Sequence, residues 1–136
     1  MKIEFLDIPK IIDRGGRGNL SVVEKNTIPF SIKRIYYLYD VPSGATRGGH
    51  AHKEQSAILI AISGSFEVIL DNGFKRQRVM LNRPNKGLLI PSMIWRELDN
   101  FSSGAICLVI ASDEFNEEDY IRNYNEFKSV IINDKL

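Results

Sequence analysis

The sequence predicts an all-β protein, a small antiparallel barrel or sandwich that is followed by a short C-terminal helical segment. Three observations predict this class. Short apolar segments recur along most of the chain, and Pro, Gly, Asn or Ser bounds each of them. Asp71-Asn72-Gly73 is a strong β-hairpin signal between two such segments. Only after residue 116 does the pattern change to the period of a helix.

The individual strands follow from β-branched and aromatic residues between turn signals. We expect strands over residues 3–6, 20–24, 32–40, 57–62, 66–70, 74–81, 87–91, 94–98 and 105–111. Residues 13–19 contain three glycines and are expected to form a turn-rich loop. Residues 117–124 and 127–132 are expected to be helical, because acidic residues at the front of a helix suit its dipole. The charged 117–124 segment then reads as a solvated helix face.

Length and charge limit the function classes. The 136 residues predict one domain spanning 1–136. Eighteen basic and seventeen acidic residues are mixed along the chain, which argues against a nucleic-acid surface or a basic membrane-binding face. The start of the chain does not look like a signal peptide, and no apolar run reaches 18 residues, so we expect a soluble, cytoplasmic protein. The single cysteine, Cys107, lies in an apolar run and is expected to be buried and inert.

The two histidines of the chain lie two positions apart, in Arg47-Gly48-Gly49-His50-Ala51-His52-Lys53. If this stretch continues into a strand, alternation places both imidazoles on one face. In a small barrel, a His-x-His strand resembles the metal-binding pattern of the cupin superfamily. In that pattern a Glu follows the second His and a third His lies in a later strand, but here Ala57 and Arg96 occupy those positions. A guanidinium cannot ligate a metal and repels a divalent ion, so no metal or other cofactor is expected.

The same residues suit proton transfer. A neutral imidazole can act as a general base or as a proton shuttle. Four arginines could receive a diphosphate or stabilise a developing enolate, namely Arg17, Arg34, Arg47 and Arg96. Arg34 and Tyr36 share one face of their predicted strand. These parts together favour an anionic carbonyl substrate.

Several collinear segments resemble the dTDP-4-keto-6-deoxyglucose 3,4-ketoisomerases over nearly the whole chain. The segments that carry this resemblance are 28–37, 47–53, 95–97, 99–103, 111–113 and 119–124. The resemblance implies a metal-independent cupin jelly roll, a homodimer with exchanged N-terminal strands, and a dTDP-linked keto sugar as substrate. It also implies a place in the biosynthesis of 3-amino-3,6-dideoxy sugars for bacterial surface polysaccharides.

The family's pattern further implies residue roles. His52 would be the base at carbon and His50 the shuttle between the sugar oxygens, while Tyr36 or Tyr37 and an arginine would stabilise an enediolate. Substrate binding would fall to Tyr37 and the four arginines named above. Arg17 resembles members that give a galacto product and Arg96 resembles members that give a gluco product, so the configuration at C4 stays open.

Two other functions fit parts of the same pattern. One is a 3,5-epimerase of a nucleotide-linked 4-keto sugar, which would also remove a proton beside a carbonyl. The other is a non-catalytic cupin that binds a sugar or senses a metal. The tyrosines at 36, 37 and 39 and Trp95 could also serve packing alone.

Overall fold

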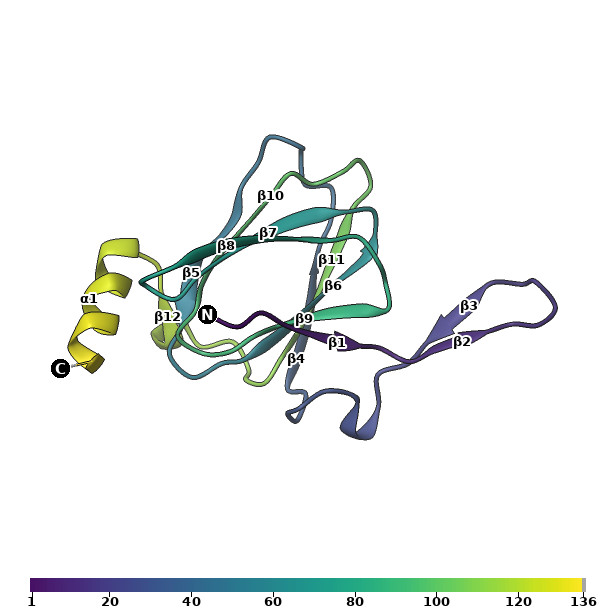
Figure 1. The fold of residues 1–136 in the computed structure, drawn as a ribbon, viewed down its shortest axis with the longest axis horizontal. Helices are drawn as coiled ribbons and strands as arrows, with labels where there is room; N and C mark the ends of the chain where they lie inside the picture. The colour runs from purple at the N-terminus through teal and green to yellow at the C-terminus, as the bar shows by residue number, and fades with distance from the viewer. Residues whose placement is uncertain (136) are drawn as a thin grey trace.

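Two five-stranded antiparallel sheets face each other in a computed structural model that describes residues 1–135 (Figure 1). The first sheet has the order β1-β9-β6-β11-β4 and the second the order β12-β5-β10-β7-β8. The two sheets are not joined into a continuous barrel by hydrogen bonds, and their arrangement is that of a jelly roll. The predicted all-β class with a C-terminal helix is confirmed.

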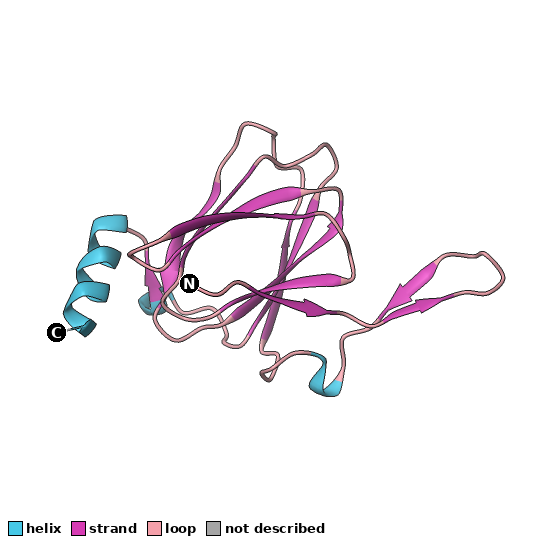
Figure 2. Cartoon of the chain, in the orientation of Figure 1, coloured by secondary structure: helices cyan, strands magenta, loops and turns pink. Residues whose placement is uncertain are grey.

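The first sheet contains β1 (Glu4–Asp7), β4 (Arg34–Leu38), β6 (Ala57–Ser63), β9 (Lys86–Ile90) and β11 (Ile106–Ala111). The second contains β5 (Arg47–His52), β7 (Phe66–Asp71), β8 (Arg76–Leu81), β10 (Trp95–Asp99) and β12 (Tyr120–Ile121). Short 3-10 turns, η1 and η2, cover Lys25–Thr27 and Glu117–Asp119. At opposite ends of the molecule lie the helix α1 (Tyr124–Lys135) and the hairpin of β2 (Lys10–Ile12) and β3 (Asn19–Ser21) (Figure 2).

The core fills the space between the sheets. Alternate side chains of the facing strands are fully buried there, among them Phe66, Leu81, Leu88 and Cys107. Burial raises the pKa of the Cys107 thiol to about 12, so the predicted buried and inert cysteine is confirmed. Trp95 is also buried, and it packs against α1 in a separate apolar cluster.

The predicted helix over residues 117–124 is wrong. Residues 117–119 form only a 3-10 turn, and Tyr120–Ile121 form the strand β12, which pairs with β5. The helix begins later, at Tyr124, and contains the predicted 127–132 segment. Main-chain pairing with β5 here outweighs the local helical signal of the acidic residues. This pairing brings the segment beside the histidines of β5. A solvated helix would have kept it away from them.

Of the predicted loop over residues 13–19, residues 13–18 form the tip of the β2–β3 hairpin, as the glycines predict, and Asn19 begins β3, whereas β2 itself was not expected. No helix within the described part of the chain is long and apolar enough to cross a membrane.

Candidate active site

The strand β5 positions the histidine pair, and two glycines shape it. Gly48 and Gly49 have φ of 81° and 71°, a left-handed conformation that glycine adopts without strain. They lie where the pairing of β5 with β10 shifts by a bulge, between the pair Gly48–Glu97 and the pair His50–Arg96. A Cβ on Gly48 would lie 3.0 Å from the carbonyl oxygen of Arg96. Gly48 therefore lets β5 approach β10 closely, and Gly49 supplies the positive φ of the bulge that precedes His50.

His50 and His52 lie on one face of β5, as alternation predicts. Their ring centroids are 4.9 Å apart in an edge-to-face arrangement, and the ring of Tyr120 lies 4.9 Å from one and 4.3 Å from the other. His52 is fully buried, whereas His50 borders a pocket. Neither ring nitrogen of His50 has a hydrogen-bond partner among residues 1–135, although both are buried. Buried polar atoms without a partner are rare, so His50 is a candidate for direct contact with a ligand.

Asp119 holds the second histidine. Its Oδ2 lies 2.9 Å from Nδ1 of His52, and it also accepts backbone N–H groups of Glu54 and Gln55 at 2.8 and 3.3 Å. Burial acts to raise the pKa of Asp119. The two backbone donors and His52 outweigh burial, so the pKa of Asp119 lies below its usual value. Because the ionised carboxylate can only accept, Nδ1 of His52 must carry the proton. The free lone pair of a neutral His52 is therefore on Nε2.

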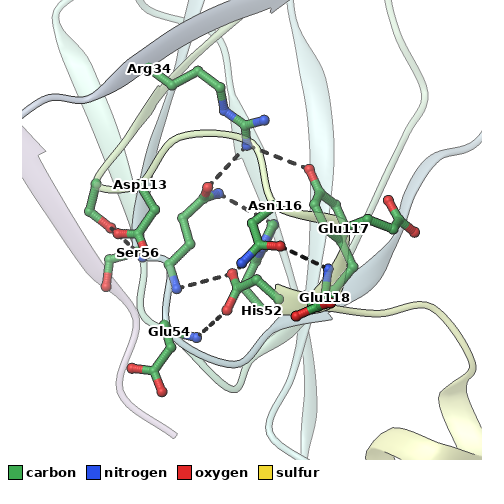
Figure 3. A network of polar contacts seen from close by, with 12 residues as sticks. Arg34, His52, Glu54, Ser56, Asp113, Asn116, Glu117 and Glu118 are labelled. Carbon is green, nitrogen blue, oxygen red and sulfur yellow. Dashed lines mark hydrogen bonds and ion pairs between the residues drawn. The ribbon is translucent and has the colours of Figure 1, made fainter.

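Gln55 closes a chain of polar contacts from the first sheet to His52. A terminal nitrogen of Arg34 donates to the side-chain oxygen of Gln55 at 3.0 Å, and Nε2 of Gln55 lies 3.3 Å from Nε2 of His52. Figure 3 shows Arg34 and His52 at opposite ends of this network. Arg34 also lies over the ring of Tyr36, 4.9 Å from its centroid, so the predicted shared face of these two residues is confirmed.

Arg96 lies buried beneath the pair. Its guanidinium donates to the backbone carbonyl of Ile94 at 3.1 and 3.3 Å, and only 3% of the residue is exposed. Burial lowers its pKa to about 10, so it stays charged at neutral pH. Together with Tyr36 and His50 it lines a small cavity of about 80 Å³ between the sheets. A buried cation thus lies beside an imidazole and a phenol.

The electrostatics of this cluster keep both imidazoles neutral. Burial, and next the charge of Arg96, lower the pKa of His50 to about 3 and that of His52 to about 4. Burial also raises the pKa of Tyr36, so its hydroxyl stays protonated and can donate a hydrogen bond. At neutral pH the site therefore holds two neutral bases, a phenol donor and a fixed positive charge, which suits proton transfer next to a carbonyl.

The pocket above His50 has a volume of about 480 Å³ and a strongly basic wall. Arg34, Arg47 and Arg122 line it, and Nε of Arg34 is buried without a partner within the described chain. Arg122 stacks on the ring of Tyr120 at 4.2 Å and pairs with Glu117. Three guanidinium groups around one opening fit a substrate that carries phosphate groups.

Two of the expected site residues lie elsewhere. Tyr37 points to the outer face of β4, 59% exposed, and packs against Tyr39. Arg17 lies at the tip of the projecting β2–β3 hairpin, where its side chain binds Asp13 at 2.8 and 3.0 Å. The structure thus brings together His50, His52, Tyr36, Arg34, Arg47 and Arg96, and it leaves Tyr37 and Arg17 outside this group.

Four further residues were not assigned to the site from the sequence, namely Gln55, Asp119, Tyr120 and Arg122. Three of them lie in the segment that was expected to be a helix. The resemblance at 119–124 could have identified these three, because an acidic and an aromatic residue are adjacent there and local packing does not require them. No three His, Cys, Asp or Glu side chains in residues 1–135 are grouped to hold a metal ion.

A two-sheet jelly roll with a histidine pair between its sheets places the protein among the cupin-like enzymes. Within this class the chain belongs to the family described as "FdtA: WxcM-like, C-terminal", whose model matches residues 1–132.

Proteins of known activity are similar over almost the whole chain. A TDP-4-oxo-6-deoxy-alpha-D-glucose-3,4-oxoisomerase from Aneurinibacillus thermoaerophilus is 43% identical over 132 residues, which cover 96% of this chain and 94% of the relative. A 3,4-ketoisomerase from Helicobacter canadensis is 46% identical, with a TM-score of 0.92 over 97% of this chain and 98% of that one. The 3,4-ketoisomerase QdtA from Thermoanaerobacterium thermosaccharolyticum, a mutant of which was solved with TDP-4-keto-6-deoxyglucose, is 35% identical, with a TM-score of 0.91 over 96% and 94% of the chains. The family and the ketoisomerase class that the sequence predicts are confirmed.

Proposed function

We propose that this protein converts dTDP-4-keto-6-deoxy-D-glucose into a dTDP-3-keto-6-deoxyhexose. The observation that carries the proposal is His50, a neutral imidazole with two unpartnered ring nitrogens that borders a pocket walled by arginines. The substrate is the sugar nucleotide named for QdtA and for the curated relative. Placement in surface polysaccharide synthesis and in the cytoplasm stays a prediction.

The reaction needs two proton transfers. The C4 ketone acidifies the hydrogen on C3, so that a base can remove it and leave an enediolate across C3 and C4. Return of a proton to C4, with transfer of the hydroxyl proton from the C3 oxygen to the C4 oxygen, moves the carbonyl to C3. Tyr36 and Arg96 line the cavity next to His50, where a phenol donor and a buried cation stabilise negative charge on the enediolate oxygens.

The geometry supports a different division of work between the histidines from the one that the resemblance implies. His50 borders the pocket, and its lone pair is free within the described chain. His52 lies deeper, with Nδ1 held by Asp119 and Nε2 facing the amide of Gln55. We therefore assign the removal of the C3 proton to His50. We assign the proton transfer between the oxygens to His52, whose Nε2 would exchange its 3.3 Å contact with Gln55 for the sugar oxygens.

The substrate's diphosphate would be bound at the mouth of the pocket. The opening is lined by Arg34, Arg47 and Arg122, and the N–H group at Nε of Arg34 has no acceptor within the described chain. Arg122 can exchange its ion pair with exposed Glu117 for a phosphate oxygen, because an exposed pair of this kind contributes little to stability.

The N-terminal hairpin supports assembly with a second copy of the chain. Ile11 and Leu20 pair across a two-stranded ribbon that projects from the sheets, and they share one of its faces, where they are 58 and 57% exposed (Figure 2). An isolated ribbon with an apolar face is not stable in water, so a partner surface is needed. In the proposed homodimer the exchanged N-terminal strands cover this face. The hairpin then carries Arg17 to the pocket of the other copy, which would explain why Arg17 lies far from the pocket of its own chain.

The function is tested by NMR of the purified protein with dTDP-4-keto-6-deoxyglucose in D₂O. We expect the carbonyl signal to move from C4 to C3 and deuterium to enter at C4 of the product. Trapping the labile product with a 3-aminotransferase then gives its configuration at C4. A 3,5-epimerase would instead label C3 and C5 and keep the ketone at C4, and an unchanged spectrum would refute any catalytic reading.

The dimer is tested by light scattering on Ile11→Asp. The wild-type protein is expected to elute with the mass of two chains, whereas the variant should shift towards one because a carboxylate cannot be buried in an apolar contact. Ile132→Asp is the matched control, since Ile132 is 49% exposed on α1 at the opposite end of the molecule. A monomeric wild-type protein would contradict the proposed exchange.

A further inference from the structure

Four side chains form one hydrogen-bond chain whose direction is fixed at both ends. Arg34 can only donate, so the oxygen of the Gln55 amide must face it and the NH₂ group must face His52. At the other end the ionised Asp119 can only accept, so Nδ1 of His52 must donate. Every link therefore runs the same way, from guanidinium to amide to imidazole to carboxylate. No link can be reversed without breaking another.

We propose that Gln55 is a positioning residue of the isomerase site, whose amide, oriented by Arg34, keeps Nε2 of His52 unprotonated. This inference rests on the proposed function, because it concerns the histidine that we assign to proton transfer between the sugar oxygens. Gln55 is 2% exposed and His52 is fully buried, so water does not compete for this contact. An N–H group aimed at Nε2 is satisfied only while that nitrogen offers its lone pair.

Among the described neighbours of His52, Gln55 is the one that donates to Nε2. Asp119 favours the charged imidazolium, and it sets Nδ1 as a donor in both protonation states. Arg96 and Arg34 disfavour the imidazolium through their charge, but neither donates to Nε2. The charged and titratable groups that surround His52 are Asp119 from η2, Arg34 from β4, His50 from β5, Arg96 from β10 and Tyr120 from β12. The contact with Gln55 thus favours an unprotonated Nε2 over a protonated one.

Gln55→Glu inverts this contact with little change in size. The carboxylate keeps an acceptor for Arg34 but replaces the N–H donor with a second acceptor, which Nε2 can satisfy only when it is protonated. In ¹⁵N-labelled protein without substrate, we expect wild-type His52 to show the Nδ1–H tautomer. In the variant the pKa of His52 should rise by about 1 to 3. Gln77→Glu, on β8 away from the pocket, makes the same chemical change and should leave His52 unaltered.

Kinetics supply the second readout. In Gln55→Glu the acidic limb of the pH profile of kcat should move to higher pH by the same amount as the pKa of His52. Gln55→Leu removes the donor without adding an acceptor, and it should lower kcat by between about tenfold and a hundredfold. KM should change by less than kcat, since His52 loses its contact with the amide outright, whereas Arg34 loses one acceptor and keeps its charge at the mouth of the pocket.

Two results would overturn the inference. One is wild-type His52 in the Nε2–H tautomer, and the other is a folded Gln55→Glu protein whose His52 titrates as in the wild type. If Gln55→Glu does not fold, the wild-type tautomer and the kcat of Gln55→Leu decide in its place. The NMR measurements need no substrate. A correct tautomer without turnover of the keto sugar would therefore refute the proposed function and support the link between Gln55 and His52.

Discussion

Replacement of His50 with Asn is expected to lower kcat by a factor of about 10² to 10⁴, the usual contribution of a positioned general base. Asn has a similar polar shape but no basic lone pair at neutral pH. His50 borders the pocket and has no hydrogen-bond partner within residues 1–135, so the protein has no evident substitute for it there. Entry of deuterium at C3 of recovered substrate should stop in this variant. NMR in D₂O measures this exchange independently of product formation.

The matched variant is His52→Asn. Under our assignment the base at carbon is intact, so exchange at C3 should persist while overall conversion to the 3-keto sugar falls. The opposite result, exchange that is lost in His52→Asn and kept in His50→Asn, would refute the assignment and restore the roles that the family resemblance implies. His52→Asn should also be the less stable of the two, because it removes the imidazole that satisfies both the Asp119 carboxylate and the Gln55 amide.

Most of the site predictions that succeeded came from the alternation of side chains between the two faces of a strand. A period of two fixed the common face of His50 and His52, and the same rule paired Arg34 with Tyr36. Arg96 was placed by resemblance to the cupin pattern, in which it takes the position of the third histidine, and it does line a cavity with His50. These residues belong to strands whose length and composition are regular. Local pattern is a sufficient guide in such cases.

The misassigned segment shows where local pattern fails. Glu117, Glu118 and Asp119 have the composition of a helix start, but Asn116 caps a single 3-10 turn and the chain then pairs with β5. That pairing is a contact between residues about 70 positions apart, and a two-residue strand has no period that could reveal it. The contacts of Asp119 with His52, Glu54 and Gln55 follow from the same long-range pairing. The part of the site that orients His52 was therefore out of reach of periodicity alone.

Arg96→Met is expected to make activity sensitive to mild acid. Burial is the larger cause of the low pKa values of both histidines, but the buried charge of Arg96 is the next cause for each. Without this charge the pKa of His50 should rise from about 3, and that of His52 from about 4, towards the ordinary 6.5. A base works when it is deprotonated, so a higher pKa means that activity is lost sooner as the pH falls. Whereas kcat/KM of the wild type should stay level from pH 8 to pH 5, that of the variant should fall within this range.

The loss of Arg96 should also weaken catalysis at pH 8, where both histidines are neutral in either protein. Removal of a preorganised group that stabilises an oxyanion costs about 10² to 10³ in kcat. Arg96→Lys separates the two effects, since it keeps the charge and with it the level pH profile, but loses the planar fork that binds the carbonyl of Ile94. Arg83→Met, at an exposed loop position, controls for net charge. A pH profile of Arg96→Met that matches the wild type would show that burial alone keeps the histidines neutral, and that the arginine acts only on the oxyanion.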